Sequence, residues 1–467
     1  MADPSISLLI GGTILLVGFG AYLVFQRYHI PDFLVLIVLG AVLYELPVAP
    51  FGPNLLSSLK LVLPLFLQLT IAFILFEGGL SLKIRQVGRA IGPLMVHVVG
   101  AFLLTFFLIW LFATRVLGLS EVASLILAVA MANPSASIAL SFAPRMRLSE
   151  RAEAGVILEG VITNVFAVMG ILYILQWAGA GSQLSLLAYG LQTALAAAVA
   201  VGVALGWRAV SRRLRGKEFL FIASLAVAVI VYAIAQLFLF QNGAVAVFLF
   251  GLVLGYHRPA TISEHIDEFV GEFTRPVEHL RSFQSEVTFA LRTFFFLYLG
   301  LLLLSEWGGV STIGFGALLT VAFVVGRVPT SLGIGAALHF PKRERRVLLA
   351  SMGRGLTDVI LILLATQTAV IPDAEASVML SLLPTAVLFS AFVCAGLLVW
   401  AGRAPVSSDA PAAGPTRVPR GAAPGPNGAG DLRVDRPSPA GPQAAYQATR
   451  SSPELASRKA RPPGPIP

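Results

Sequence analysis

Charge is scarce in this sequence of 467 residues. Asp, Glu, Lys and Arg together make up 12% of it, and 57% of the residues are hydrophobic. Soluble domains carry roughly 25% charged residues. The mean hydropathy of +0.83 excludes the class of soluble globular domains. We therefore predict an all-α, multi-pass protein of the cell membrane.

Cysteine and the common catalytic motifs are also scarce. Cys394 is the only cysteine, which excludes a disulfide within the chain and a cysteine-based metal site. We find no phosphate-binding Walker loop, no nucleophile elbow, no dinucleotide fingerprint and no His/Cys/Asp cluster with metal-site spacing. We expect neither an enzyme nor a cofactor. The net charge of +9 lies mostly in short loops and in the C-terminal segment, so we expect no nucleic-acid partner.

The chain does contain a long series of apolar stretches. We count about thirteen, each close to the roughly 20 residues that a bilayer requires. They run near residues 5–26, 32–48, 59–80, 91–113, 120–142, 153–177, 184–207, 218–239, 243–256, 284–304, 312–339, 346–369 and 376–401. No positive segment precedes the first stretch, so we expect it to stay as a span and not to be a cleaved signal peptide. We predict a transmembrane domain over residues 1–401.

After this domain the composition changes. From residue 402 onward Pro, Gly, Ala and Ser prevail without apolar periodicity. Such a segment buries too little apolar surface to offset the entropy of ordering it. We predict a disordered cytoplasmic tail over residues 402–467, which is either dispensable or regulatory.

The loops predict the orientation of the chain. Clusters of basic residues follow the odd-numbered spans, whereas the loops between them are neutral or acidic. The basic residues are Arg27; Lys83, Arg85 and Arg89; Arg145, Arg147 and Arg151; Arg212, Arg213, Arg215 and Lys217; and Lys342, Arg343, Arg345 and Arg346. By the positive-inside rule, the N-terminus lies outside and the C-terminus inside.

The fifth span carries a signal for a broken helix. Pro134 removes a backbone donor and disfavours helical geometry at Asn133. Ser135 and Ser137 follow, so polar groups surround the interruption. Such breaks occur at membrane depth where the backbone lines a cavity or is buried in protein. The alternative is a simple proline kink.

The twelfth span carries a second signal. Gly353 and Gly355 flank Arg354, and Asp358 follows four residues after the arginine. The fifth and twelfth spans lie seven apart, as expected if spans one to six repeat as spans eight to thirteen. Paired interruptions in corresponding halves are typical of transporters built from inverted repeats. We therefore predict inverted repeats with broken fifth and twelfth helices.

The sixth span concentrates polar side chains. Glu159, Thr163 and Asn164 lie within two turns, and the first two are four residues apart and share a face. A polar group at the bilayer centre costs several kcal/mol unless a partner or a water-filled cavity receives it. We expect these side chains to face the broken spans.

The buried charges require partners, because an unpaired charge in a membrane is strongly penalised. Glu159 and Asp358 are acidic, and Arg354 and Arg327 are basic. We predict that Glu159 pairs with Arg354 in a structural ion bridge. Asp358 either completes that network or binds Arg327.

Four stretches together resemble the monovalent cation/proton antiporter superfamily, particularly its archaeal and bacterial sodium- or potassium-proton exchangers. Residues 27–32 read RYHIPD, residues 73–80 read FILFEGGL, residues 292–300 read RTFFFLYLG and residues 353–356 read GRGL. The matching segments occur in the family's order over residues 8 to 400.

The resemblance implies a homodimer of roughly thirteen-helix subunits embedded in membrane lipid. Spans four to six and eleven to thirteen are expected to form a core domain, and spans one to three and eight to ten a dimerisation domain. Na⁺ or K⁺ and H⁺ are the implied transported ions. They compete for one carboxylate, because a carboxylate offers both hard anionic oxygens and a titratable proton.

The sequence departs from the family at the centre of the site. Where relatives typically read E-S-x-x-N-D or E-S-x-x-T-D, this chain keeps Glu159 and Thr163 but has Asn164 in place of the ion-carrying Asp. The fifth span has Asn133 where relatives often have Asp. An amide neither titrates nor carries charge. A cation would be held transiently by the neutral oxygens of the polar residues Asn133, Ser135, Ser137, Thr163 and Asn164, without the usual proton switch.

Three interpretations follow. The chain is an antiporter sequence that lost its carboxylate and is inactive or trapped. Or it is a working exchanger whose proton is carried by Glu159 or Asp358. Or it is a uniporter, a channel-like facilitator or a non-transporting regulatory protein on the same fold.

Overall fold

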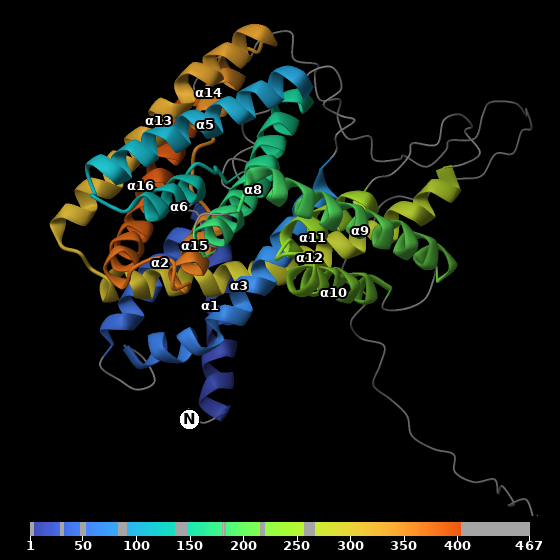
Figure 1. The fold of residues 1–467 in the computed structure, drawn as a ribbon, viewed down its shortest axis with the longest axis horizontal. Coiled ribbons are helices and arrows are strands. Elements are labelled where there is room, and N and C mark those ends of the chain that lie inside the picture. The colour runs from blue at the N-terminus through green and yellow to red at the C-terminus, as the bar shows by residue number, and fades with distance from the viewer. Residues whose placement is uncertain are drawn as a thin grey trace, which may run out of the picture. The chain divides into compact units, whose positions relative to one another are not determined.

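The computed structural model describes residues 4–28, 32–46, 53–82, 91–135, 148–179, 181, 184–214, 220–255 and 267–402. Within these ranges the chain forms helices and no strand (Figure 1). The helices are α1 (Pro4–Tyr28), α2 (Asp32–Glu45), α3 (Pro53–Ser81), α5 (Ile91–Arg115), α6 (Glu121–Met131), α8 (Glu150–Gly179), α9 (Leu186–Arg213), α10 (Leu220–Phe238), α11 (Gly243–Gly255), α12 (Asp267–Ser305), α13 (Val310–Ala337), α14 (Lys342–Ala350), α15 (Leu356–Thr366) and α16 (Asp373–Gly402).

The predicted all-helical membrane fold is confirmed. Each of the thirteen predicted spans corresponds to described helix, and the twelfth is divided between α14 and α15. Seven of the described helices are long and apolar enough to cross a membrane, and six shorter apolar helices accompany them. The predicted tail after Gly402 lies outside the described residues, and the orientation of the termini stays a prediction.

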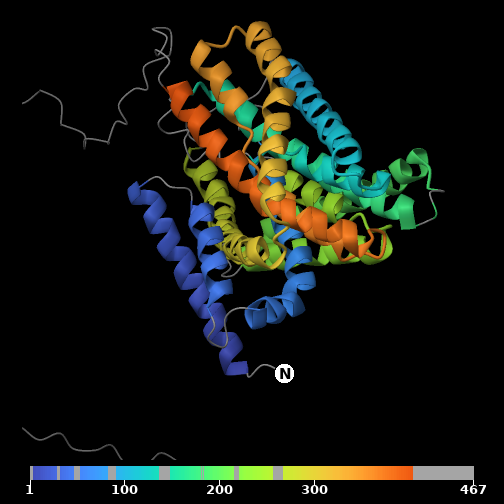
Figure 2. The same ribbon diagram turned by 90° about the vertical axis from the view of Figure 1, so that its left-hand side faces the viewer.

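The helices pack in two sets. In one set α11 packs against α3, α9 and α10, and α12 packs against α1, α2 and α3. In the other set α13 packs against α5, α14 and α16, and α6 packs against α5. Both α8 and α15 contact helices of both sets and lie between them (Figure 1). Figure 2 shows α1 and α2, in blue, beside α12.

Glycines at two crossings allow helices of the first set to approach closely. At Gly300 of α12, a Cβ atom would lie beside the carbonyl oxygen of Ile37 and the Cα of Gly40 in α2. At Gly79 of α3, a Cβ would meet the carbonyl oxygen of Phe248 in α11 at 2.3 Å. Small residues at helix crossings are the usual basis of membrane helix association, because dispersion contacts replace the hydrophobic effect in lipid.

Both predicted helix breaks are present. Helix α6 starts at Glu121 after the N-cap Ser120, whose hydroxyl accepts from the Ala123 amide, and it ends at Met131, three residues before Pro134. Between α14 and α15, residues 351–355 are not helical. The two interruptions touch, since the Ser135 amide donates to the Gly353 carbonyl at 2.8 Å. One backbone donor of the first break is thus satisfied by a backbone acceptor of the second, which helps to meet the requirement for paired backbone groups inside a membrane.

Candidate functional site

A cluster of polar side chains surrounds Asn133 at the break after α6. Its Nδ2 donates to Asn164 Oδ1 of α8 at 2.5 Å and to Asp358 Oδ1 of α15 at 3.3 Å. Its Oδ1 lies 2.6 Å from the Thr163 hydroxyl, which is also 2.7 Å from the Glu159 carbonyl. One amide therefore joins both broken spans to the sixth span.

The cluster is deeply placed. Asn133, Thr163 and Asp358 are each at most 1% exposed, whereas Asn164 is half-buried. Asn164 is therefore the member that a cavity or a solvent path reaches most readily. The oxygens of an acid, two amides and a hydroxyl are ligands that hard cations accept. No group of three His, Cys, Asp or Glu residues that could hold a metal ion occurs among the described residues.

Asp358 is positioned by the start of α15. Residues 353–355 form the non-helical approach to α15, and the Gly355 amide donates to Asp358 Oδ2 at 3.0 Å. A carboxylate in the first turn of a helix is favoured by the helix dipole and caps a free amide. Its second oxygen, Oδ1, faces Asn133. The carboxylate is thus held by the break on one side and presented to the cluster on the other.

Glu159 has a different partner from the predicted one. Arg327 of α13 binds it with two nitrogens, at 2.5 Å to Oε1 and 2.8 Å to Oε2, and donates a further bond of 2.7 Å to the Leu348 carbonyl. The predicted pairing with Arg354 is therefore wrong. The cause is the rotation of α13, which directs Arg327 toward α8. Both partners are at most 2% exposed, so this is a buried bidentate ion pair.

Arg354 lies near the cluster without hydrogen-bonding to Glu159, and it interacts electrostatically with Asp358. Its guanidinium carbon is 3.9 Å from the centre of the Phe323 ring, and its backbone amide donates to the Ser390 hydroxyl. Nε and Nη1 of this arginine have no hydrogen-bond partner among the described residues. Stacking on an aromatic face partly compensates a buried cation. Arg327 is committed to Glu159, so the predicted alternative of an Asp358–Arg327 bond is not formed.

Of the remaining predicted site residues, Ser135 lies within the described part of the chain and Ser137 does not. Ser135 is half-buried, and its side chain lies where a Cβ added to Gly355 would meet it at 2.5 Å. It thus belongs to the crossing of the two breaks. Ser137 lies outside the described residues. His97 of α5 was not predicted as a site residue, although its Nε2 is 3.7 Å from Glu159 Oε2.

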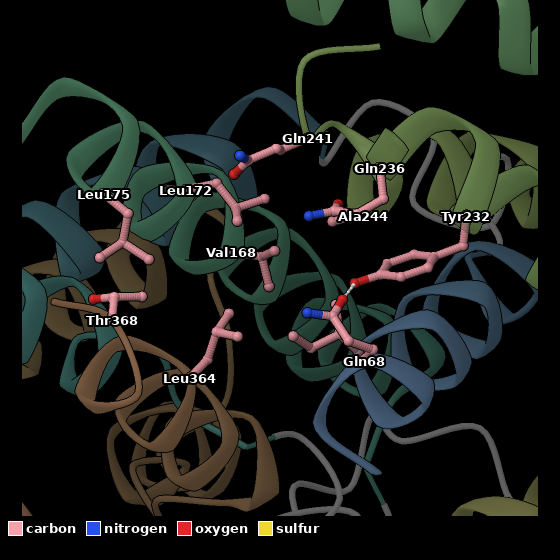
Figure 3. A pocket seen from close by; sticks show the side chains of 11 residues that line it. Gln68, Val168, Leu172, Leu175, Tyr232, Gln236, Gln241, Ala244, Leu364 and Thr368 are labelled. Atoms are coloured by element: carbon pink, nitrogen blue, oxygen red, sulfur yellow. Dashed lines mark hydrogen bonds between the residues drawn. The ribbon is translucent and has the colours of Figure 1, made fainter. Parts of the chain in front are cut away.

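A cavity of about 310 Å³, which was not predicted, lies beside the cluster. Figure 3 shows that Tyr232 of α10 points toward Gln68 of α3, and that apolar side chains of α8 face them. The only sequence signal is the presence of Gln68 and Gln236 within apolar spans. Val168, which lines the cavity, is one turn beyond Asn164 on α8.

Comparison with known proteins identifies one family by its sequence model and one similar fold among solved structures. A family model described as the transmembrane region of sodium/hydrogen exchangers matches residues 12–403. The sequence has no match among curated proteins. The fold is similar to that of the sodium proton antiporter MjNhaP1 from Methanocaldococcus jannaschii at pH 8, with a TM-score of 0.65 and 16% identity over 86% of this chain and 99% of that chain. An electron-microscopy structure of the same antiporter gives a TM-score of 0.65 and 16% identity over 85% and 98% of the two chains.

Proposed function

Because the chain belongs to the sodium/hydrogen exchanger family, we propose that it exchanges Na⁺ or K⁺ for H⁺ across the membrane and that Asp358 is the carboxylate for which cation and proton compete. Transport of this kind changes no covalent bond, so the protein is proposed as a carrier and not as an enzyme. The predicted homodimer and the division into core and dimerisation domains are part of the same proposal.

One observation carries the assignment to Asp358. The same Asn133 nitrogen contacts Asn164 Oδ1 and Asp358 Oδ1. Asn164 occupies the position at which the family resemblance places the ion-carrying Asp. Asp358 therefore brings a carboxylate to the same small volume from the opposite broken span. The site therefore keeps one carboxylate, at position 358, although position 164 carries an amide in place of the Asp that the family resemblance implies.

The other buried acids are engaged elsewhere. Among the described residues, only Glu159, Glu344 and Asp358 are buried acids. Arg327 holds both oxygens of Glu159, and removing a carboxylate from a buried bidentate pair costs several kcal/mol. Glu344 accepts from the Ser149 amide at the start of α8, away from the cluster. The hydrogen-bond donors to Asp358 are neutral, Asn133 and the Gly355 amide, and the buried Arg354 interacts with its carboxylate electrostatically without holding either oxygen in a bidentate pair.

The exchange follows from competition at this group. When Asp358 is ionised, its oxygen and those of Asn164 and Thr163 supply hard ligands for a dehydrated monovalent cation. When it is protonated, the negative charge is lost and the cation leaves. Asn133 contributes by holding two of these oxygens close together, and its NH₂ group must withdraw when a cation takes its place. A shift of the core helices then exposes the site to the other side.

The test compares Asp358→Asn with the unaltered protein in proteoliposomes that contain a pH-sensitive dye. We expect the variant to lose cation-driven proton movement, because an amide cannot carry the proton. Restoring a carboxylate across the site, with Asn164→Asp added to Asp358→Asn, should restore exchange. The control is Asp373→Asn, the same chemical change at an exposed position, which should leave exchange and melting temperature unchanged.

Each other outcome rejects the proposal in a defined way. If Asp358→Asn exchanges as well as the unaltered protein, Asp358 is not the carrier. Cation flux without proton movement in the unaltered protein would identify a uniporter or channel-like facilitator. A folded, unaltered protein that moves neither ion would mean that the amide at position 164 has inactivated the chain.

A further inference from the structure

The cavity beside the cluster is lined by polar groups without charge. Gln68, Tyr232, Gln236, Gln241 and Thr368 supply amide and hydroxyl oxygens, and no charged side chain occurs among the described residues that line it. Figure 3 shows the amides of the three glutamines beside a wall of apolar α8 side chains. The cavity is thus an oxygen-lined space with one apolar face.

Its position links the surface to the candidate site. A second cavity of about 510 Å³ shares Leu175, Gln241 and Thr368 with the first, and Gly179 and Leu184 also line it, at and beyond the end of α8. At the inner end Val168 is one turn from Asn164, and the cluster itself does not line the cavity. The two cavities follow the second half of α8 and stop short of the site.

We propose that the cavity is a vestibule in which an alkali cation, partly stripped of water, binds to the uncharged oxygens of Gln68, Tyr232 and Gln236 before it reaches Asp358. The inference rests on the proposed function, because it supplies the cation for that exchange. Its new content is a second, weaker cation site and the residues that form it.

The absence of charge suits such a role. Conduction requires a site that is favourable enough to take up an ion and weak enough to release it. A carboxylate in the vestibule would hold the cation strongly and would also bind protons, whereas an amide oxygen does neither. A cation in apolar surroundings loses far more hydration energy than it can recover there. Side-chain oxygens are therefore needed along the apolar wall of α8.

The hydrogen bond between Tyr232 and Gln68 gives the vestibule a point of control. The Tyr232 hydroxyl donates to Gln68 Oε1 and thereby joins α10 to α3. Tyr232 is 7% exposed, so this bond is formed away from solvent. A cation that binds Gln68 Oε1 either displaces the phenolic hydrogen or shares the oxygen with it, because an amide oxygen has two lone pairs. Removing the Tyr232 hydroxyl should therefore change how strongly the vestibule binds a cation.

The first experiment measures access to the vestibule by thiol labelling. Cys394 is the only cysteine of the chain, and it is buried. A Cys394→Ala background therefore contains no thiol that could react. Gln236→Cys is placed in this background and treated with a membrane-impermeant, positively charged thiosulfonate from the side predicted to be extracellular. The matched control is Leu237→Cys, the next residue on α10, which is 75% exposed on the apolar outer surface.

We expect the cysteine at 236 to react, Na⁺ or K⁺ to slow the reaction, and the attached cation to reduce exchange about tenfold or more. The control should keep its exchange activity after the same treatment. A cysteine at 236 that does not react, or that reacts at a rate independent of Na⁺ and K⁺, overturns the proposal.

The second experiment separates the vestibule from the Asp358 site. Tyr232→Phe removes the hydroxyl and keeps the ring, and it should change the half-saturating cation concentration several-fold while the pH dependence of exchange stays the same. An unchanged half-saturating concentration counts against the vestibule. Asp358→Asn in the Gln236→Cys background should abolish exchange but keep labelling and its cation protection. If the Asp358→Asn variant still exchanges and Gln236→Cys is still labelled and protected by the cation, the role of Asp358 is refuted and the vestibule is not.

Discussion

At the scale of single residues, Asn133 is the group on which the site is built. It contacts Thr163, Asn164 and Asp358 through one side-chain amide. An amide can donate with its nitrogen and accept with its oxygen at the same time, which a carboxylate at this position could not do. The Asn at 133 and the Asp at 358 therefore fit each other chemically.

Asn164→Asp in the otherwise unaltered protein tests whether position 164 belongs to the ion site. Asn133 Nδ2 would still find an acceptor there, and the site would hold two carboxylates in place of one. We expect a lower half-saturating cation concentration and a stronger dependence of exchange on pH, since two negative groups attract the cation and two protons are needed to neutralise them. Flux in proteoliposomes over a range of pH measures both. If neither dependence changes, position 164 lies outside the ion site.

Arg327→Met tests the structural role of the buried ion pair. Removing one partner of such a pair leaves a buried charge uncompensated and costs about 3–5 kcal/mol. We expect a large fall in melting temperature, and a partial recovery when Glu159→Gln is added. Arg115→Met, at an exposed position, is the control and should change the melting temperature little. A stable single variant would show that Glu159 does not depend on Arg327.

Sequence reasoning could predict which charges are buried but not how they pair. Arg327 and Arg354 both lie in apolar spans, and either could balance Glu159. The choice depends on the rotation of α13 about its axis and on the course of the non-helical residues 351–355, which no local pattern determines. The vestibule was hidden for a similar reason, because its residues come from spans far apart in the sequence and meet only after the helices pack.

At the scale of elements, the broken helices were the most predictable feature. Pro134 removes a backbone donor, and Gly353 and Gly355 weaken a helix at the matching place in the other half. These effects are local, so they could be predicted without knowledge of the packing. The contact between the breaks, from the Ser135 amide to the Gly353 carbonyl, depends on the fold and could not.

Gly300→Val tests the crossing of α2 and α12. A Cβ at this position would lie against the backbone of Ile37 and Gly40, and backbone cannot move aside as a flexible side chain does. Overpacking of this kind costs typically about 1–3 kcal/mol. We expect a lower melting temperature in detergent. Gly202→Val on α9, where a new Cβ meets nothing within 4 Å, should melt as the unaltered protein does, and equal melting of both variants would contradict the close crossing.

At the scale of the whole molecule, the buried charges predict electroneutral exchange. Around the cluster, Arg327 and Arg354 are balanced by Glu159 and ionised Asp358. Binding one proton to Asp358, or one monovalent cation beside it, adds the same single charge. The site therefore has the same charge when it holds the proton as when it holds the cation, so the membrane potential acts equally on the two forms. We expect transport in proteoliposomes to transfer no net charge in the transient current on a solid-supported membrane, and to be insensitive to a membrane potential imposed without a gradient of Na⁺ or K⁺. Net charge transfer would contradict one-for-one exchange at Asp358.

The hydrogen bond between the two breaks also bears on how the protein is made. Ser135 and Gly353 belong to opposite halves of the chain, yet each satisfies a backbone group of the other inside the membrane. Synthesis proceeds at about 5–20 residues per second, so on the order of ten seconds or more separates their emergence from the ribosome. During that interval the first half lacks the Gly353 carbonyl, to which the Ser135 amide donates in the folded protein. The contact between the two breaks is therefore completed only when the twelfth span arrives, so the first half reaches its final arrangement after most of the chain has been made.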